Sequence, residues 1–178
     1  TVGALSLDEV NSFKPTSKKL FYKKYNIKDE PFALITFHPE TVSTEDNIHF
    51  AKEVKKSLEK LCGLINIVLT MPNADTLGSI YRKAIHEAKE AHPNSIILIE
   101  NFGKINYFNA MYYASILIGN TSSGIIEAAS FNKYVINVGD RQKGRMHCSN
   151  VINIPFDSKK IYEKVSETLN LGNYKGDN

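Results

Sequence analysis

The chain alternates short apolar runs with longer segments in which apolar residues recur every three or four positions. The runs are rich in β-branched residues and nearly continuous, which is typical of strands covered on both faces. They span residues 32–37, 65–71, 95–100, 115–119, 134–139 and 150–154. The helical periodicity predicts helices over residues 17–25, 45–61, 76–91, 106–114, 123–131 and 158–169.

This alternation predicts an α/β fold: a Rossmann-like, doubly wound, mostly parallel sheet with helices on both faces. We assign residues 29–171 to this domain, residues 1–28 to a hinge or linker with a leading helix, and residues 172–178 to a frayed tail. The chain begins with Thr1 rather than Met, and its first ten residues look like the end of a preceding segment. Its 178 residues suffice for one well-buried domain and hardly for two.

Composition and charge narrow the classes of function. A net charge of +3 without a dense Lys/Arg block does not favour a nucleic-acid partner. No apolar run approaches the roughly 18 residues of a membrane span, and the start does not resemble a signal peptide. Cys62 and Cys148 lack the spacing of a zinc site or a disulfide framework, and no HExxH motif occurs. We therefore expect a cytoplasmic protein with no bound metal, no membrane contact and no nucleic-acid partner.

Ligands of such sheets bind outside the carboxyl ends of the strands, so the residues after each apolar run are the candidates. After the first run, "HPET" places His38 beside a proline-fixed turn, where it could bind phosphate as imidazolium, transfer a proton or merely cap the turn. In "MPNAD", Asn73 and Asp75 could bind a hydroxyl-rich ligand, although turn formation and helix capping are favoured locally. In "ENFG", backbone groups could pair with a base edge, and Phe102 either lies against a ring or belongs to the core.

The segment "GNTSSGIIEAASF", Gly119 to Phe131, has the chemistry of a phosphate site. Gly119 allows a tight turn, and Asn120, Thr121 and Ser122 supply donors. The free N–H groups of a helix that starts near residues 123–125 point at the same place and favour an anion. The segment matches no Walker pattern, because no GK[ST] follows it.

Two charged residues complete the candidate site. Glu127 falls one turn into the predicted helix, where it either reaches past the phosphate to hydroxyls such as a ribose diol or serves as a capping-box residue. Arg141, in "GDRQKGR", is placed to bridge a phosphate oxygen. A solvated basic loop is the alternative, and it is more credible for Lys143 and Arg145. No GxSxG motif supports a serine nucleophile.

The motifs "FHPET", "MPNAD", "ENFG", "GNTSSGIIEAASF" and "VINVGDRQKGR" resemble the carboxyl-terminal half of UDP-N-acetylglucosamine 2-epimerases. The likeness is strongest to the hydrolysing branch of sialic-acid and related nonulosonic-acid biosynthesis. It covers residues 1–154, and residues 118–145 are its most specific part. The resemblance implies a glycosyltransferase-B architecture, with two Rossmann-like domains across a cleft and UDP on the second. The amino-terminal domain would then be missing, and the first ten residues would be its last strand and the hinge.

The resemblance also implies roles for individual residues. His38 would contact the diphosphate and assist catalysis, Thr121 and Ser122 would bind phosphate, and Glu127 would bind the ribose hydroxyls. Glu100, Asn101 and Phe102 would line the uracil pocket, largely through their backbone. The other UDP-binding residues that we expect are Asn73, Ser123, Gly124 and Arg141.

The implied reaction removes the C2 proton of the sugar, eliminates UDP in anti geometry and adds water, giving ManNAc and UDP. "HPET" stands where the non-hydrolysing branch has an HRRE-like motif, which favours hydrolysis. No cofactor is implied beyond the UDP of the substrate, and the resemblance to a family of common dimers implies a homodimer only for the full-length protein. The alternatives are a non-hydrolysing epimerase, a glycosyltransferase of the same architecture, and a non-enzymatic nucleotide-sugar-binding module. This chain alone is expected to be inactive.

Overall fold

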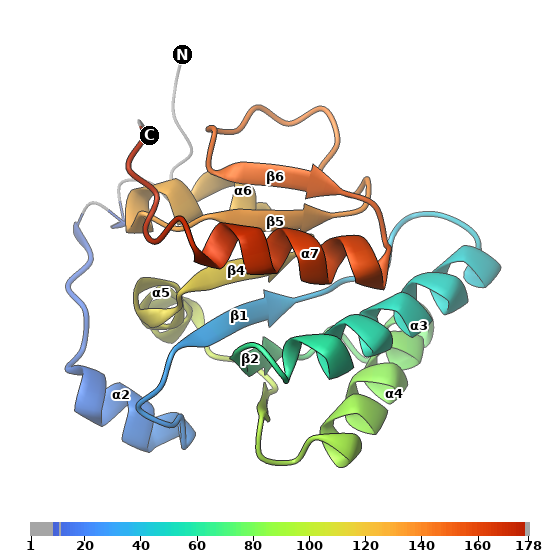
Figure 1. The fold of residues 1–178 in the computed structure, drawn as a ribbon, viewed down its shortest axis with the longest axis horizontal. Coiled ribbons are helices and arrows are strands. Elements are labelled where there is room, and N and C mark those ends of the chain that lie inside the picture. Colours follow the sequence, from blue (N-terminus) through green and yellow to red (C-terminus); the bar gives the residue numbers. More distant parts are fainter. Residues whose placement is uncertain (1–8, 11, 177–178) are drawn as a thin grey trace.

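A computed structural model describes residues 9–10 and 12–176 and shows one six-stranded parallel sheet (Figure 1). Its strand order is β3-β2-β1-β4-β5-β6, the Rossmann order, in which the direction of winding reverses between β1 and β4. The register pairs Thr36 at the end of β1 with Gly119 at the end of β4. The strands are β1 (Phe32–Thr36), β2 (Asn66–Thr70), β3 (Ile96–Ile99), β4 (Ile116–Gly119), β5 (Val135–Val138) and β6 (Val151–Ile154).

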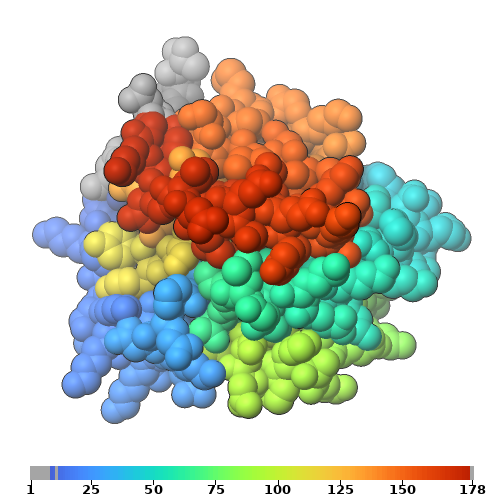
Figure 2. Space-filling view, viewed as in Figure 1, coloured from blue at the N-terminus to red at the C-terminus, as the bar shows by residue number. Residues whose placement is uncertain are grey.

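Helices cover both faces of this sheet, as the alternating pattern predicted. One face carries α3 (Thr44–Leu61), α4 (Thr76–Ala91) and α7 (Ser158–Leu169). The other face carries α2 (Lys18–Tyr25), α5 (Lys104–Tyr113), α6 (Ser122–Ile126) and the 3₁₀ helix η1 (Ala128–Phe131). The space-filling view shows α7 and α3 side by side across the first face, so the sheet beneath them is covered (Figure 2).

The nearly continuous apolar runs are explained by burial on both sides of the sheet. In β1, Ala33 and Ile35 join the core under α3, α4 and α7, whereas Phe32 and Leu34 join the core on the opposite face. All four are almost completely buried. Burial of a large apolar side chain contributes about 1.5–3 kcal/mol, so both layers are needed to stabilise the sheet.

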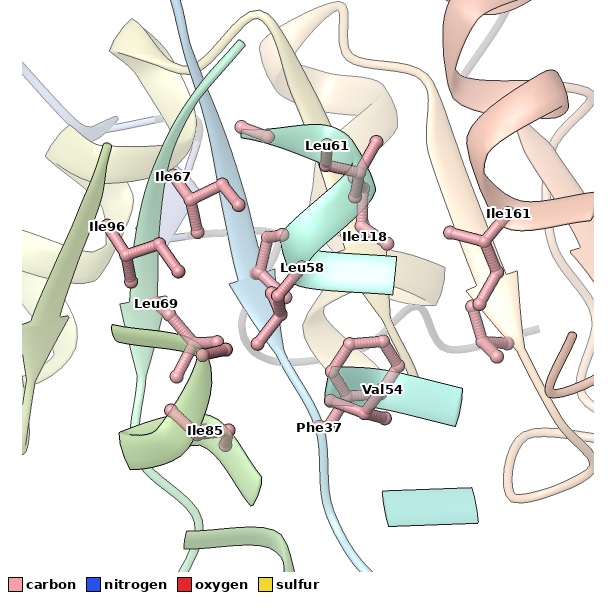
Figure 3. Packing of buried hydrophobic residues seen from close by; sticks show 14 of the residues in the cluster. Phe37, Val54, Leu58, Leu61, Ile67, Leu69, Ile85, Ile96, Ile118 and Ile161 are labelled. Carbon is pink, nitrogen blue, oxygen red and sulfur yellow. The ribbon is translucent and has the colours of Figure 1, made fainter. Parts of the chain in front are cut away.

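The core under α3 shows how the helical periodicity is used. Val54, Leu58 and Leu61 lie on one stripe of α3 and point toward the sheet, where they meet Ile67 and Leu69 of β2 (Figure 3). Their spacing of three and four residues brings them onto the same face of the helix. This stripe therefore fixes α3 in position, with its N-terminus directed to the carboxyl edge of the strands.

Short polar side chains cap the N-termini of α3, α4 and α7. The Ser43 hydroxyl accepts from the Asp46 N–H at 3.1 Å, and the Asp75 carboxylate accepts from the Gly78 N–H at 2.7 Å. Asp157 accepts from the N–H groups at positions 159 and 160, at 2.9 and 3.1 Å. Each cap satisfies backbone donors that the first helical turn leaves without a partner. The alternative interpretation of Asp75 as a helix cap is thus confirmed.

Two expectations about elements differ from the structure. The single helix predicted over 123–131 is divided at Glu127 into α6 and η1. Asn132 then adopts a left-handed conformation, and the Lys133 N–H closes onto the Ala128 carbonyl at 3.0 Å, which turns the chain into β5.

The predicted frayed tail is the second difference. Tyr174 is buried, its N–H donates to the Asn132 carbonyl at 2.9 Å, and its hydroxyl lies 3.0 Å from Ser149 Oγ. At this position, the free energy gained by burying the aromatic ring exceeds the entropic cost of ordering the chain. Of the first ten residues, which were predicted to form a last strand and the hinge, residues 1–8 lie outside the described residues, and so do residues 177–178.

Candidate functional site

A cleft of about 620 Å³ opens at the carboxyl edge of the sheet, where the direction of winding reverses between β1 and β4. Parallel strands place all their carboxyl ends at this edge, so motifs far apart in the sequence meet here. The cleft contains every site residue that the family resemblance implies except Gly124, whose α-carbon faces Val135. The expected residues that line it are His38, Asn73, Glu100, Asn101, Phe102, Thr121, Ser122, Ser123, Glu127 and Arg141.

His38 enters the cleft directly after β1, and its backbone is held by Asn120. The His38 N–H donates to Asn120 Oδ1 at 2.8 Å, and Asn120 Nδ2 donates to the His38 carbonyl at 2.9 Å. Asn120 is completely buried, so its side chain does not supply the phosphate donor that we expected. Burial lowers the pKa of His38, and the Arg141 charge lowers it further against the opposing effect of Asp75. The imidazole is therefore neutral at pH 7 in the free protein.

The loop after β4 presents donors at the start of α6. Thr121 is the N-cap, and its hydroxyl accepts from the Gly124 N–H at 3.2 Å. The N–H groups of Ser122 and Ser123 precede the first full turn, so no carbonyl of α6 can pair with them. Because α6 has only five residues, these two N–H groups and the hydroxyls matter more than any helix dipole. Gly119, with φ of 139°, is required because a Cβ there would lie 1.8 Å from the Thr36 carbonyl oxygen.

Glu127 lies at the base of the cleft with an unused acceptor. The residue is buried, and its Oε2 has no hydrogen-bond partner. A capping-box role does not fit, because the N-cap is Thr121 and the capping-box position is Gly124. An unpaired buried carboxylate oxygen is costly, and hydroxyl groups of a ligand would satisfy it.

Arg141 reaches the cleft from a tight turn after β5. Its side chain is exposed and lines the cleft, while its N–H donates to Glu40 Oε1 at 3.1 Å. The preceding Gly139 has φ of 83°, and a Cβ there would lie 2.1 Å from the same carboxylate oxygen. Arg145 also lines the cleft, unlike Lys143, whose ammonium pairs with Asp140 at 3.1 Å. The solvated-loop alternative therefore fits Lys143 and not Arg145.

The loops after β2 and β3 form the opposite wall. Asn73 is exposed there, and the Asn101 side chain accepts from the Gly103 N–H at 2.7 Å. The Glu100 carboxylate pairs with Arg82 through two bonds of 2.6 and 3.0 Å, so the backbone of Glu100 is what remains for a ligand. Phe102 is buried, and its ring centroid lies 4.6 Å from that of Tyr25, which agrees with a place in the core.

The expected site omitted several residues that line the cleft. Thr36, Thr70 and Tyr107 form a hydroxyl floor: the two threonine hydroxyls are in contact, and the Tyr107 hydroxyl lies 3.4 Å from Thr36 Oγ1. Burial raises the pKa of Tyr107, so its phenol stays protonated. The two threonines lie within apolar runs and looked like strand residues, so only the pairing of β1 with β2 reveals the floor. Lys104 and Gln142 were also omitted.

Two absences concern only the described part of the chain. Residues 9–10 and 12–176 contain no group of three or more His, Cys, Asp or Glu side chains arranged to hold a metal ion. In the same residues, no helix is both long and apolar enough to cross a membrane.

Comparison with known proteins places this geometry in a family. The chain is 33% identical over 168 residues to the "GDP/UDP-N,N'-diacetylbacillosamine 2-epimerase (hydrolyzing)" of Campylobacter jejuni, covering 92% of this chain and 43% of the relative. It is 32% identical over 179 residues to the "UDP-N,N'-diacetylbacillosamine 2-epimerase (hydrolyzing)" of Legionella pneumophila, covering 99% and 46%. The chain thus spans less than half the length of these curated relatives.

A solved structure shows the same fold. The Neisseria meningitidis UDP-GlcNAc 2-epimerase bound to UDP-GlcNAc matches with a TM-score of 0.70 at 16% identity, over 96% of this chain and 47% of that chain. The six-stranded parallel sheet with its helices thus corresponds to slightly less than half of that chain. The family model described as UDP-N-acetylglucosamine 2-epimerase matches residues 1–177. With nearly every residue covered by that match, the chain belongs to the UDP-N-acetylglucosamine 2-epimerase family.

Proposed function

We propose that the cleft binds the UDP moiety of a UDP-2-acetamido sugar and serves a hydrolysing 2-epimerase. One observation carries the proposal: Glu127 Oε2 is buried without a hydrogen-bond partner. Glu127 lines the same cleft as Arg141 and the loop after β4 that presents N–H and hydroxyl donors. A nucleoside diphosphate has the complementary chemistry, with an anionic end and a hydroxyl-bearing end. Two relatives named as hydrolysing epimerases support the reaction class.

The diphosphate is bound by the positive side of the cleft. The N–H groups and hydroxyls of Ser122 and Ser123 donate to one phosphate, and the Arg141 guanidinium bridges the other. His38 donates an imidazole N–H to the diphosphate. The backbone N–H groups of Ser122 and Ser123 are fixed before the ligand arrives, so they stabilise the charge that develops on UDP as it departs.

Glu127 and the opposite wall orient the nucleoside. The Glu127 carboxylate accepts from the ribose diol, and its burial keeps water from competing. The backbone after β3, at Glu100 to Phe102, pairs with the uracil edge. The Glu100 side chain stays engaged with Arg82.

The proposed reaction balances as an elimination followed by hydration. A base removes the C2 proton, the bond from C1 to the diphosphate oxygen breaks in anti geometry, and a C1–C2 double bond forms as UDP leaves. Water then adds in syn geometry: its hydroxyl bonds to C1, and a proton bonds to C2. This proton enters from the face opposite to the one that lost the original C2 proton. The products are UDP and the free 2-epimeric sugar. This chain's share is to bind UDP, to stabilise it as the leaving group and to shield the glycosidic bond from uncontrolled hydrolysis.

Calorimetric titration with UDP tests the proposal, with CMP as the control ligand. We expect micromolar-to-millimolar binding of UDP and little binding of CMP. Arg141→Ala and Ser122→Ala each remove a charge-assisted hydrogen bond, which contributes roughly 1.5–3 kcal/mol, so each lowers affinity about tenfold or more. Lys143→Ala is the matched control, because it removes the same charge from the same loop at a position outside the cleft. Unchanged affinity in both variants, or equal binding of UDP and CMP, would contradict the proposed site.

A further inference from the structure

A buried polar cluster beside the cleft, of which only Gln142 also lines it, joins the loops that carry His38 and Arg141. Its members are Glu40, Asn47, Asn120 and Gln142, all buried, and none is needed to contact UDP in the proposed site. Buried polar side chains are costly unless they are hydrogen-bonded, so their partners indicate what they do. We call this group the clasp.

The carboxylate of Glu40 binds the turn that precedes and contains Arg141. Its Oε1 accepts from the Asp140 N–H at 2.8 Å and from the Arg141 N–H at 3.1 Å, across 100 and 101 residues of sequence. The turn lies so close that a Cβ at Gly139 would be 2.1 Å from Oε1 and 2.5 Å from the Phe156 ring. A carboxylate that accepts two N–H groups holds a turn more firmly than a neutral acceptor does.

The backbone of Glu40 is itself held by the Asn47 side chain of α3. Its N–H donates to Asn47 Oδ1 at 3.1 Å, and Asn47 Nδ2 returns a bond to the Glu40 carbonyl at 3.1 Å. The Tyr81 hydroxyl of α4 lies 3.2 Å from the same Asn47 oxygen. The carboxylate therefore projects from a rigid base formed by α3 and α4.

The other two members of the clasp, Gln142 and Asn120, form hydrogen bonds at the loop after β4. Gln142 Nε2 donates to the Asn120 carbonyl at 2.8 Å, and the Asn120 side chain holds the backbone of His38. The ends of β1, β4 and β5 are thus joined by side chains that bond to backbone. His38 and Arg141 start from fixed backbone positions on either side of the same opening.

We infer that Glu40 is a positioning residue that acts through Arg141, setting the direction from which the guanidinium reaches the diphosphate. This inference rests on the proposed function, because it takes UDP as the ligand that Arg141 meets. The carboxylate bonds to the backbone of Arg141, and the guanidinium is left free for an anion. Without this carboxylate, the turn after Gly139 would have no buried acceptor for two N–H groups and would lose its position.

A double-mutant cycle on the whole chain tests the inference, with UDP affinity measured by calorimetry. Glu40→Ala should weaken UDP binding about tenfold in the parent chain and less than about twofold in the Arg141→Ala background. Glu40→Gln keeps an acceptor oxygen and should recover most of the affinity. A merely structural role of Glu40 would lower affinity by the same factor in both backgrounds, and that result would overturn the inference.

Glu53→Ala is the matched control. Glu53 is also a buried glutamate whose carboxylate accepts a backbone N–H, that of Ser158 at 2.8 Å, but it lies outside the cleft. This variant should lower the unfolding temperature and leave UDP affinity within about twofold. A loss of affinity as large as that of Glu40→Ala would show that general destabilisation explains both variants.

Amide hydrogen exchange supplies a readout that does not depend on UDP. The Asp140 and Arg141 amides should exchange faster in Glu40→Ala and remain protected in Glu40→Gln and Glu53→Ala. If the parent chain does not bind UDP, the proposed function fails, and the exchange data then decide separately whether Glu40 holds the turn. Unchanged protection in Glu40→Ala would overturn the positioning role in either case.

Discussion

Individual polar residues around the cleft divide into those that face ligand space and those that bond to backbone. Arg141 and Ser122 face the opening, whereas Asn120 and Glu40 are buried and bond to distant main-chain groups. Both kinds look alike in the sequence, since Asn and Glu occur in ligand sites and in turns. Their burial separates them, because a completely buried Asn120 with both amide groups engaged has nothing left for a phosphate.

His38 provides a pH test at this scale. Its pKa is lowered in the free protein by burial and by Arg141, and a bound diphosphate would raise it again. UDP binding should then take up a proton, so affinity should increase as pH falls through the interval between the free and bound pKa values. Protonation of UDP itself, near pH 6, opposes this trend.

The comparison with His38→Gln isolates the histidine. Calorimetry between about pH 8 and about pH 6 should show the ratio of parent to variant affinity increasing as pH falls, because only the parent gains an imidazolium. The same pH dependence in both proteins would mean that His38 does not meet the diphosphate.

Among the elements, α3 connects the cleft to the rest of the fold. Its N-terminal part supports Glu40 through Asn47, and Glu53 in its middle accepts the Ser158 N–H at the start of α7 at 2.8 Å. Lys56 also donates to Glu53, at 2.7 Å. Burial raises the pKa of Glu53, but the bonds from Lys56 and Ser158 outweigh it and lower the pKa from 4.5 to about 2.

This shift predicts how α3 and α7 respond to acid. A carboxyl whose pKa is lower in the folded state adds stability above its unfolded pKa of 4.5, and this stability is lost as pH falls toward 2. Glu53→Gln should therefore reduce the free energy of unfolding by roughly 1.5–3 kcal/mol at pH 7, a typical value for charged hydrogen bonds. Urea unfolding should show the gap to the parent narrowing between about pH 5 and about pH 3.

Glu163→Gln is the control for this measurement. Glu163 is an exposed residue of α7, 4.0 Å from Lys159, and exposed pairs contribute about 0–1 kcal/mol. Its variant should unfold like the parent at every pH. A gap between Glu53→Gln and the parent that stays constant with pH would contradict the role of the Glu53 charge.

At the scale of the whole molecule, the proposed elimination needs a base that removes the sugar C2 proton as well as a site for UDP. Two glutamates line the cleft within the described residues: Glu100 pairs with Arg82, and we place Glu127 against the ribose hydroxyls. Neither is free to remove a sugar C2 proton. The curated relatives are more than twice as long as this chain.

We therefore predict that this chain alone binds UDP but does not turn over UDP-GlcNAc. A coupled assay for released UDP should show no rate above the blank, because proton removal needs a positioned base and a closed site. The relative from Legionella pneumophila or Campylobacter jejuni is the positive control, assayed with the substrate that its name states. Catalytic UDP release by this chain would contradict the prediction.

Local patterns sufficed to predict the architecture and most of the candidate residues that line the cleft. Helical and strand periodicity depend on neighbours within a few residues, so the boundaries of α4 and α7 agree with prediction. Parallel strands then collect their carboxyl ends at one edge, which is why motifs from residues 38 to 141 meet in one cleft. Their binding of UDP stays a prediction.

Long-range packing decided what the pattern could not. The bonds from Asn120 to His38 and from Glu40 to the Arg141 turn join residues 82 and 101 positions apart, and no local preference encodes such partners. The burial of Tyr174 and the division of the helix at Glu127 also depend on neighbours brought by the fold. Residue types determine which hydrogen bonds and apolar contacts a side chain can form, whereas the folded chain determines which partners are within reach.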